Sequence, residues 1–390
     1  MYRYTSLLLT LSIIASMLSP TYVKAEDNNN SIAHTAPSAV LMEKNSGMTL
    51  FDKEADKKLP PASMTKVMTM LLIMEELQKG TLSLDETVRI SEHAASMGGS
   101  QIFLEAGEEM SVQDLLKGVA VASGNDASVA LAERISGSEE EFVKMMNKKA
   151  KEIGLKNTHF ENPTGLPADN HYSTARDMAV MARELLLHED ITDYTTIYED
   201  YLRKGEKNEF WLVNTNKLIK SYPGMDGLKT GFTKKAKYCL TATAKKGDLH
   251  MIAVVMGAEK PKERNEAVTS LLDFGFGQYE GQLLHSQDEI IEKMTNPRGT
   301  PSTLPLKPEK DVVVLKRKNE PKVNYTTEVT MNEAAELPVK KGDHLGWLTV
   351  SNGKEEVSKV RLEAAETMNK ANLIDLWERS FRNLSGFEKF

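Results

Sequence analysis

The spacing of apolar residues predicts a mixed α/β region over residues 37–280. Residues 63–79 follow Pro60-Pro61-Ala62 and carry apolar side chains around nearly the whole helical circumference, which predicts a helix buried in a domain centre. Shorter patterns predict strands over 39–42, 48–51, 226–233, 237–245 and 249–258, and helices over 111–121, 125–136, 139–153, 174–188 and 263–275. Strands at both ends with helices between them predict one α/β layer fold.

Beyond residue 281 the pattern changes to short alternating runs. Four prolines between 297 and 308 predict a linker or loop. Runs of alternating apolar residues then predict strands over 312–315, 323–329, 345–350 and 357–362. We therefore expect a small all-β domain over 281–365, following the α/β region over 37–280.

Residues 366–390 return to helical spacing. Leu373, Trp377, Phe381 and Leu384 fall on one stripe, with basic residues away from it. An amphipathic helix of this kind can lie in a membrane interface, and we expect a membrane-anchor helix here. A helix docked on the β domain or on a partner is the alternative.

The first residues predict export. Arg3 precedes an apolar run from about Leu7 to Leu18, and Val23-Lys24-Ala25 supplies a small-residue cleavage pattern. The alternative is a membrane anchor, but the run is shorter than the roughly 20 apolar residues that a span needs. We expect a signal peptide over 1–25 and a loose polar leader over 26–36. The mature protein would then work outside the cell, at the outer face of the cytoplasmic membrane or in the cell wall.

Composition narrows the function further. The chain has 390 residues, a length that favours two domains. A net charge of −7, with no long basic run, does not favour nucleic acid as a partner. Cys239 is the one cysteine, so an internal disulfide is excluded, and a lone thiol in an apolar strand favours a place in the core. His and Cys spacing predicts no metal site, and we expect no cofactor.

A Ser-x-x-Lys pattern occurs at Ser63 and Lys66, and again at Ser351 and Lys354. The second copy falls in a turn of the β domain. The first copy opens a helix, so its two side chains lie on one face, one turn apart. Burial would lower the pKa of Lys66, and a neutral lysine next to a serine hydroxyl makes that serine nucleophilic. The alternative interpretation is that Ser63 only caps the helix.

Two later motifs are less specific when taken alone. Ser123-Gly124-Asn125 separates two predicted helices, and it can be a helix-breaking turn or can present a hydroxyl and an amide to a cleft. Lys229-Thr230-Gly231 lies in a predicted strand. There Gly231 would allow close backbone approach, and a peptide could pair along the edge. An ordinary solvent-facing edge strand is the alternative.

Together, in this order, the three motifs resemble those of the serine penicillin-binding proteins: Ser-x-x-Lys, Ser-x-Asn and Lys-Thr-Gly. The sequence looks closest to the low-molecular-mass D-alanyl-D-alanine carboxypeptidases of Gram-positive bacteria. The likeness covers nearly the whole chain and includes the runs 98–127, 162–166 and 227–231. It implies an antiparallel sheet with helices on both faces and a helical subdomain, followed by a small all-β domain and an amphipathic anchor.

The resemblance also implies a role for each motif residue. Ser63 would attack the D-Ala–D-Ala carbonyl of peptidoglycan stem peptides, Lys66 would act as general base, and Ser123 would pass a proton to the leaving D-alanine. Asn125 would orient Lys66 and the substrate. The remaining expected residues bind substrate: the backbone N–H of Phe232 joins that of Ser63 in an oxyanion hole, and the terminal carboxylate contacts Lys229, Thr230, Gly231 and Arg264. β-Lactam antibiotics would acylate the same serine and inhibit the enzyme.

One position departs from the family pattern. Many relatives have Ala-Gly-Tyr after the third motif, whereas this chain has Ala236-Lys237-Tyr238. A charged side chain beside the cleft strand puts substrate preference and rate in question.

Three other functions compete with the carboxypeptidase. A class A β-lactamase would carry a Glu-x-x-x-Asn pattern, but Glu161 is followed four residues later by Gly165. A D,D-endopeptidase that cuts cross-linked peptidoglycan would share every motif. A non-enzymatic wall-binding protein is disfavoured because no motif residue is missing.

Overall fold

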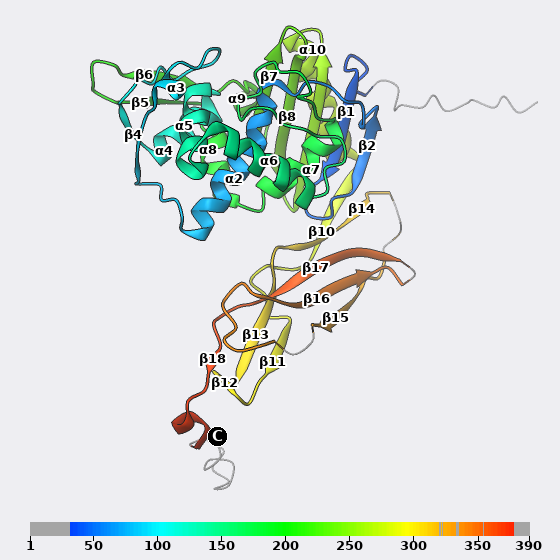
Figure 1. Ribbon diagram of the computed structural model, residues 1–390. Helices are drawn as coiled ribbons and strands as arrows, with labels where there is room; N and C mark the ends of the chain where they lie inside the picture. The colour runs from blue at the N-terminus through cyan, green and yellow to red at the C-terminus, as the bar shows by residue number, and fades with distance from the viewer. Residues whose placement is uncertain (1–31, 320, 322, 333–334, 354, 378–390) are drawn as a thin grey trace, which may run out of the picture.

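The computed structural model describes residues 32–377 except 320, 322, 333, 334 and 354. The described chain forms two bodies (Figure 1). The first contains a sheet with helices around it, and the second is an elongated group of strands that begins with β10 (Tyr279–His285). The expected signal peptide, and most of the expected leader, lie outside the described residues.

A five-stranded antiparallel sheet forms the centre of the first body, in the order β2-β1-β9-β8-β7. Its strands are β1 (Ser38–Glu43), β2 (Thr49–Lys53), β7 (Met225–Thr233), β8 (Lys237–Lys246) and β9 (Leu249–Ala258). Strand β1 is buried at every position, and β9 is buried at nearly all of them. Both faces of these strands are therefore covered, which explains their continuous apolar runs.

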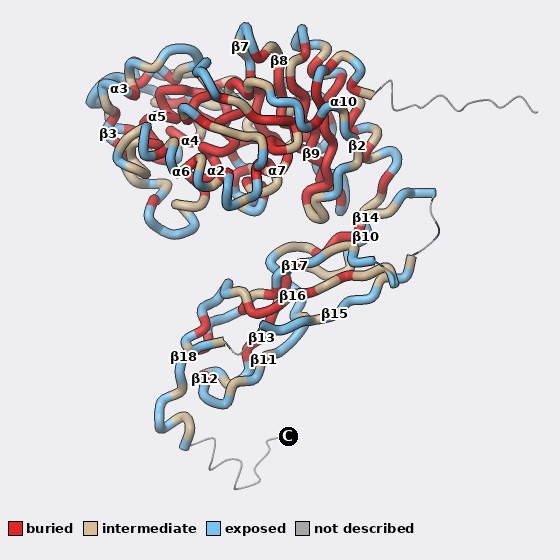
Figure 2. The backbone as a smooth tube through the Cα atoms, turned by 45° about the vertical axis from the view of Figure 1, so that its right-hand side comes forward, coloured by how far each residue is buried: buried red, intermediate tan, exposed pale blue. Residues whose placement is uncertain are grey.

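Helices cover both faces of this sheet, as the family resemblance implies. Helix α10 (Pro261–Gln278) covers one face, where Leu271 and Leu272 pack with Leu41. Helices α2 (Lys66–Lys79) and α7 (Ala175–Leu185) lie on the other face, within the larger apolar cluster. Figure 2 shows buried segments concentrated between these layers.

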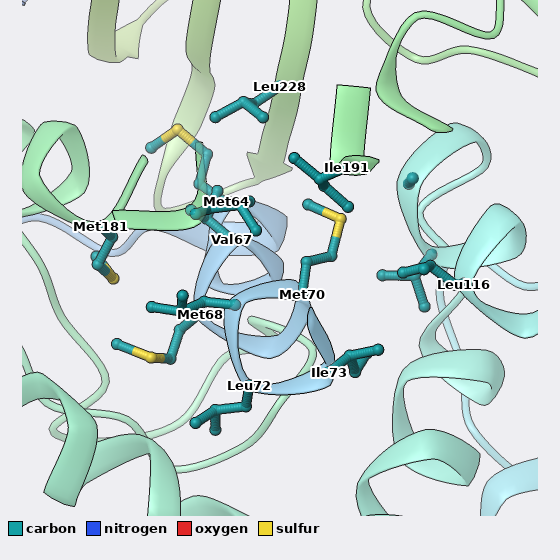
Figure 3. Close-up of a cluster of buried hydrophobic side chains, with 14 of the residues drawn as sticks. Met64, Val67, Met68, Met70, Leu72, Ile73, Leu116, Met181, Ile191 and Leu228 are labelled. Carbon is teal, nitrogen blue, oxygen red and sulfur yellow. The ribbon is translucent and has the colours of Figure 1, made fainter. Parts of the chain in front are cut away.

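Helix α2 lies inside the first body, as its circumferential apolar pattern predicts. Its residues from Lys66 to Met74 are buried, and Gly80 ends it in a left-handed conformation with φ 72°. Figure 3 shows Met68, Leu72 and Ile73 pointing in different directions around the helix axis, with Met181 and Leu116 belonging to neighbouring elements. The helix therefore holds its N-terminal turn in a fixed position relative to the sheet.

A helical subdomain fills the sequence between β2 and β7. Ser and Thr side chains cap several of its helices: Ser111, Ser138 and Thr174 each accept a backbone N–H bond at a helix start. Its remaining elements are η2 (Ala62–Thr65), β3 (Thr87–Arg89), α3 (Glu92–Ala95), β4 (Glu109–Ser111), α4 (Val112–Val121), α5 (Asn125–Ser136), α6 (Glu139–Glu152), η3 (Glu189–Ile191), α8 (Thr192–Thr195), β5 (Glu199–Leu202), β6 (Phe210–Val213) and α9 (Leu218–Ser221).

The second body is all β. Strands β10 (Tyr279–His285) and β14 (Val312–Arg317) pair next to the first body, and a five-stranded sheet follows in the order β11-β13-β17-β16-β15. The other strands are β11 (Glu292–Thr295), β12 (Gly299–Thr300), β13 (Thr303–Pro308), β15 (Thr326–Met331), β16 (His344–Ser351), β17 (Glu356–Ala364) and β18 (Asn369–Lys370).

The expected linker at 297–308 is wrong in part, because β13 lies within it. Leu304 and Leu306 alternate inward and are fully buried, and the carbonyl of Pro305 accepts a hydrogen bond from the Ala365 N–H at 3.0 Å. Proline removes a donor but keeps its acceptor, so inward leucines outweigh the turn signal here.

Two expected boundaries also change. Residues 32–36, expected as loose leader, form a turn in which Ala33 and Ala36 are buried, and the Ala33 N–H donates to Ser270 Oγ on α10 at 3.3 Å. The helix expected over 366–390 begins later, because residues 366–372 are not helical and Met368 is buried in the β domain. Residues 373–377 are helical, and the rest of that expectation lies outside the described residues. No helix among the described residues has the length and apolar character to cross a membrane.

Candidate active site

Ser63 and Lys66 meet at the N-terminal end of α2. Ser63 is half-buried in the short 3-10 helix η2, and Lys66 is the first residue of α2. The Lys66 Nζ–Ser63 Oγ distance is 3.3 Å. Neither η2 nor α2 has a side-chain cap, so the capping interpretation of Ser63 is wrong. The hydroxyl of Ser63 contacts an amine instead of a helix-end N–H.

Lys66 is fully buried, which is unusual for a lysine. Its Nζ lies 2.6 Å from Asn125 Oδ1 and 2.8 Å from the Thr164 carbonyl oxygen. Burial holds the pKa of Lys66 well below its ordinary value, and the nearby charge of Lys229 adds to this effect, while Asp126 opposes it. Both carbonyl partners can only accept hydrogen bonds, so they use two N–H groups. When the amine is neutral, its lone pair is then left for the hydroxyl proton of Ser63.

Ser123 lies in the connection between α4 and α5, and Asn125 is the first residue of α5, as the sequence predicts. Ser123 has φ 65° and is nearly fully buried, and its Oγ has no hydrogen-bond partner among the described residues. Asn125 is held at both ends of its amide. Its Oδ1 accepts from Lys66, and its Nδ2 donates to the Gly98 carbonyl at 2.6 Å. Only one orientation of the Asn125 amide satisfies both contacts.

Asp126 supports this arrangement and was not expected from the sequence. It is completely buried, and its carboxylate accepts the backbone N–H groups of Ile102, at 3.0 and 3.1 Å, and of Leu104, at 3.1 Å. These bonds hold residues 98–104, whose Gly98 carbonyl positions Asn125. An acidic residue in the first helical turn was the available signal, but it does not show which distant N–H groups the carboxylate binds.

The 162–166 loop supplies the third partner of Lys66. Asn162 Oδ1 accepts from the N–H groups of Thr164 and Gly165, and Thr69 on α2 donates to the Pro163 carbonyl at 2.7 Å. A Cβ at Gly165 would lie 1.8 Å from the Ala62 carbonyl oxygen, so this loop packs directly on the turn that carries Ser63. The sequence marked these residues only as part of the family likeness and gave them no chemical task.

Strand β7 forms the edge of the sheet beside Ser63, as expected. A Cβ at Gly231 would lie 2.7 Å from the Pro61 carbonyl oxygen, so the glycine permits the approach of the two backbones. Lys229 is buried, and its Nζ donates to the Thr230 carbonyl at 3.1 Å. Burial, with the nearby charge of Arg264, lowers the pKa of Lys229 to about 7. Thr230 Oγ1 donates to Thr215 Oγ1 at 2.7 Å.

Arg264 and Phe232 complete the set of expected residues. Arg264 lies in the first turn of α10, is buried, and donates to Asn265 Oδ1 from two nitrogens at 3.0 and 2.8 Å. Its charge lies near enough to Lys229 to contribute to the lowered pKa of that lysine. The Phe232 side chain is 53% exposed and stacks on Tyr238 with ring centroids 4.4 Å apart. The Phe232 ring therefore packs on Tyr238, and the expected role of the Phe232 backbone N–H stays a prediction.

Comparison with known proteins identifies the family. The family model described as "D-alanyl-D-alanine carboxypeptidase" (peptidase S11) matches residues 23–260. This chain belongs to that family. A second model, "Penicillin-binding protein 5, C-terminal domain", matches residues 279–370.

Similar proteins match the whole of this chain or large parts of it. The D-alanyl-D-alanine carboxypeptidase DacF of Bacillus subtilis (strain 168) is 51% identical over 389 residues, which is 100% of both chains. The structure of penicillin-binding protein 5 from Haemophilus influenzae matches with a TM-score of 0.66 and 31% identity, over 86% of this chain and 98% of that one. Penicillin-binding protein D2 from Listeria monocytogenes, in its ampicillin-bound form, matches with a TM-score of 0.56 and 31% identity, over 62% and 98%.

Lys237, where this chain departs from the family pattern, has φ 58°, a conformation that favours glycine. Its Nζ lies 3.1 Å from Glu259 Oε2, in a largely exposed ion pair. The backbone conformation explains why glycine suits this position, and the charge of Lys237 is directed to Glu259.

Two other chemical groups can be placed. The Cys239 thiol is buried on β8, and burial raises its pKa to about 11, which suits a core residue rather than a nucleophile. Among residues 32–377, outside the gaps given above, His, Cys, Asp and Glu side chains form no group of three that could hold a metal ion.

Proposed function

We propose that this chain is a serine D-alanyl-D-alanine carboxypeptidase that removes the terminal D-alanine from peptidoglycan pentapeptides through an acyl-enzyme on Ser63. The observation that carries the proposal is the buried Lys66 amine, which contacts the Ser63 hydroxyl, the Asn125 amide and a loop carbonyl at once. A lysine with a strongly lowered pKa beside a half-buried serine is equipped to take a proton at neutral pH. The family membership supplies the substrate class.

Binding would follow strand β7. The terminal carboxylate would lie against the positive charge of Lys229 and Arg264, with the Thr230 hydroxyl as a donor. The peptide would pair along the side of β7 that faces away from β8, since β7 is the edge strand of the sheet. The carbonyl to be attacked would then lie between Ser63 and Phe232, whose backbone N–H groups would stabilise its developing negative charge.

The chemistry has two steps. In the first, Lys66 takes the Ser63 proton and Oγ bonds to the carbonyl carbon. The C–N bond then breaks as Ser123 gives its proton to the leaving D-alanine nitrogen and regains one from Lys66, which returns to its neutral form. In the second, water attacks the ester, releases the shortened peptide and returns a proton to Ser63. The buried Ser123 Oγ has no hydrogen-bond partner among the described residues. This supports the proton transfer, because no other group competes with the substrate nitrogen for the Ser123 hydroxyl.

β-Lactams would follow only the first step. The cyclic amide would acylate Ser63, but its leaving group would stay tethered. The Listeria relative in its ampicillin-bound form supports this part of the proposal.

The deciding experiment incubates the protein with labelled penicillin and maps the adduct by mass spectrometry. We expect the label on Ser63, and its loss in Ser63→Ala. Ser351→Ala is a matched control, because Ser351 opens the second Ser-x-x-Lys pattern in the β domain and should not affect labelling. A label elsewhere, or none, refutes the mechanism. A pentapeptide and a cross-linked dimer, compared for free D-alanine and for dimer cleavage, then separate carboxypeptidase from endopeptidase.

We also propose that the chain is exported, cleaved after Ala25, and held at the outer face of the cytoplasmic membrane by its C-terminal segment. Leu373, Ile374 and Trp377 are 85%, 69% and 68% exposed, which supports an apolar surface facing away from the β domain. Because residues 366–372 belong to that domain, the informative truncation ends at residue 372. The truncated protein should leave the membrane fraction while it still binds penicillin. If it stays with the membranes, the anchor proposal fails, and N-terminal sequencing of the mature protein tests the cleavage site.

A further inference from the structure

A cavity of about 410 Å³ opens directly beside the Ser63 turn. Three segments line it: Pro60 to Ala62 before Ser63, residues 165–169 of the loop that contacts Lys66, and Thr233 with Lys235 at the end of β7. His171 also lines the cavity, and its Nε2 lies 2.8 Å from Thr65 Oγ1. None of the expected site residues lines this cavity, so the mechanism above leaves it unused.

The direction of β7 places this cavity relative to a bound substrate. Along the strand, Lys229 and Thr230 come first, then Phe232, then Thr233. If the terminal carboxylate lies at Thr230 and the attacked carbonyl at Phe232, the part of the peptide that stays on the enzyme continues toward Thr233. Adjacent Cα atoms are about 3.8 Å apart, so the residue before the two D-alanines lies one such step beyond the attacked carbonyl. That position is next to Thr233, which lines the cavity.

The cavity carries two opposite charges on separate elements. Asp169 is exposed on the loop, and Lys235 is exposed just beyond β7. Among the described residues, neither forms an ion pair. Leu166, on the same loop as Asp169, gives the cavity an apolar wall. Burial lowers the pKa of His171 to about 4, so this ring adds no charge near neutral pH.

We propose that this pocket receives the side chain of the residue that precedes the two D-alanines, and that Asp169 and Lys235 select a side chain ending in one ammonium and one carboxylate group. The apolar wall would contact the methylene groups of such a diamino dicarboxylic acid. This inference rests on the proposed function, because it assumes the direction of the substrate along β7.

The test compares three acylated donor peptides that end in D-Ala-D-Ala. Their preceding residue is meso-diaminopimelate, with an amine and a carboxylate; L-lysine, with an amine only; or Nε-acetyl-L-lysine, with neither. We expect kcat/KM to fall in that order, by about fivefold per lost ion pair. Lys235→Gln should abolish the difference between the first two donors, and Asp169→Asn the difference between the last two.

A matched control separates a local effect from a general loss of charge. Lys234→Gln changes the neighbouring exposed lysine, which does not line the cavity, and should leave the order unchanged. Equal kcat/KM for the three donors, or equal effects of Lys234→Gln and Lys235→Gln, overturns the inference. Benzylpenicillin has no preceding residue and should acylate every variant equally. If it acylates none, wild type included, the proposed function fails first, and the selectivity claim fails with it.

Discussion

Replacing Asp126 by asparagine tests how the interior supports the site. The carboxylate accepts the N–H groups of Ile102 and Leu104, and Oδ2 serves both. In Asp126→Asn, an NH₂ group at that position would face N–H donors that it cannot accept. Whichever way the amide turns, one buried N–H group loses its acceptor: that of Leu104 if the NH₂ takes the Oδ2 position, or that of Ala127 if it takes the Oδ1 position. The remaining bonds to a charged carboxylate also become weaker bonds to a neutral amide. We expect a loss of about 3 kcal/mol in the free energy of unfolding, or about 6–12 °C in Tm for a domain of this size.

The same substitution should alter the pH dependence of acylation. The negative charge of Asp126 raises the pKa of Lys66, against the larger effect of burial. Removing that charge lowers the Lys66 pKa further. Because Lys66 must be neutral to act as a base, the acidic limb of the acylation rate should move to lower pH. The maximal acylation rate at higher pH should also fall. Asp126 holds residues 98–104, and their Gly98 carbonyl positions Asn125.

The assays are thermal unfolding and the rate of labelled-penicillin binding measured against pH. Asp177→Asn is the matched control: Asp177 is also a buried first-turn acid, and its Oδ2 accepts from the Asn157 N–H and Thr158 Oγ1, both at 2.8 Å. It should lower stability without moving the pH profile. A Tm change below about 2 °C in Asp126→Asn, or an acidic limb that moves to higher pH, would refute the reasoning.

Three further predictions concern stability. The buried His171 has a folded-state pKa of about 4 against 6.5 for the ordinary group, so the unfolded chain binds the proton first as pH falls. The free energy of unfolding should fall by about 3 kcal/mol between pH 6.5 and 4. Urea titrations of His171→Gln should show a smaller fall over the same pH range, and an equal fall in both proteins would contradict this. Lys237→Gly should raise Tm, because relief of the positive φ contributes about 1 kcal/mol, more than the loss of the exposed ion pair with Glu259 costs. A lower Tm would show that the positive φ of Lys237 does not destabilise the fold. Gly165→Ala should cost more than about 2 kcal/mol and slow acylation through its clash with Ala62, whereas Gly154→Ala, with a similar φ and open space around it, isolates the backbone cost.

Much of the fold followed from local patterns. The buried helix α2, the five strands of the central sheet and the Gly80 stop are each specified by residues close together in sequence. Element ends were less predictable where distant contacts decide them. Strand β13 carries turn-forming prolines, and it forms a strand because Leu304 and Leu306 reach the core of the β domain. Residues 366–372 have helical spacing but are not helical because Met368 is buried in that same core.

The sequence by itself singled out the three motifs, because side-chain chemistry and spacing are written in it. Helix geometry alone links Ser63 to Lys66, since residues three apart share one helical face. The roles of Ser123 and of the β7 residues stay predictions. Only the tertiary structure showed which groups hold the Lys66 amine in place. The Thr164 carbonyl contacts the amine itself, and the Gly98 carbonyl holds Asn125, which contacts the amine from another side. Every residue has a carbonyl, so its partner depends on where the chain folds rather than on the identity of the residue.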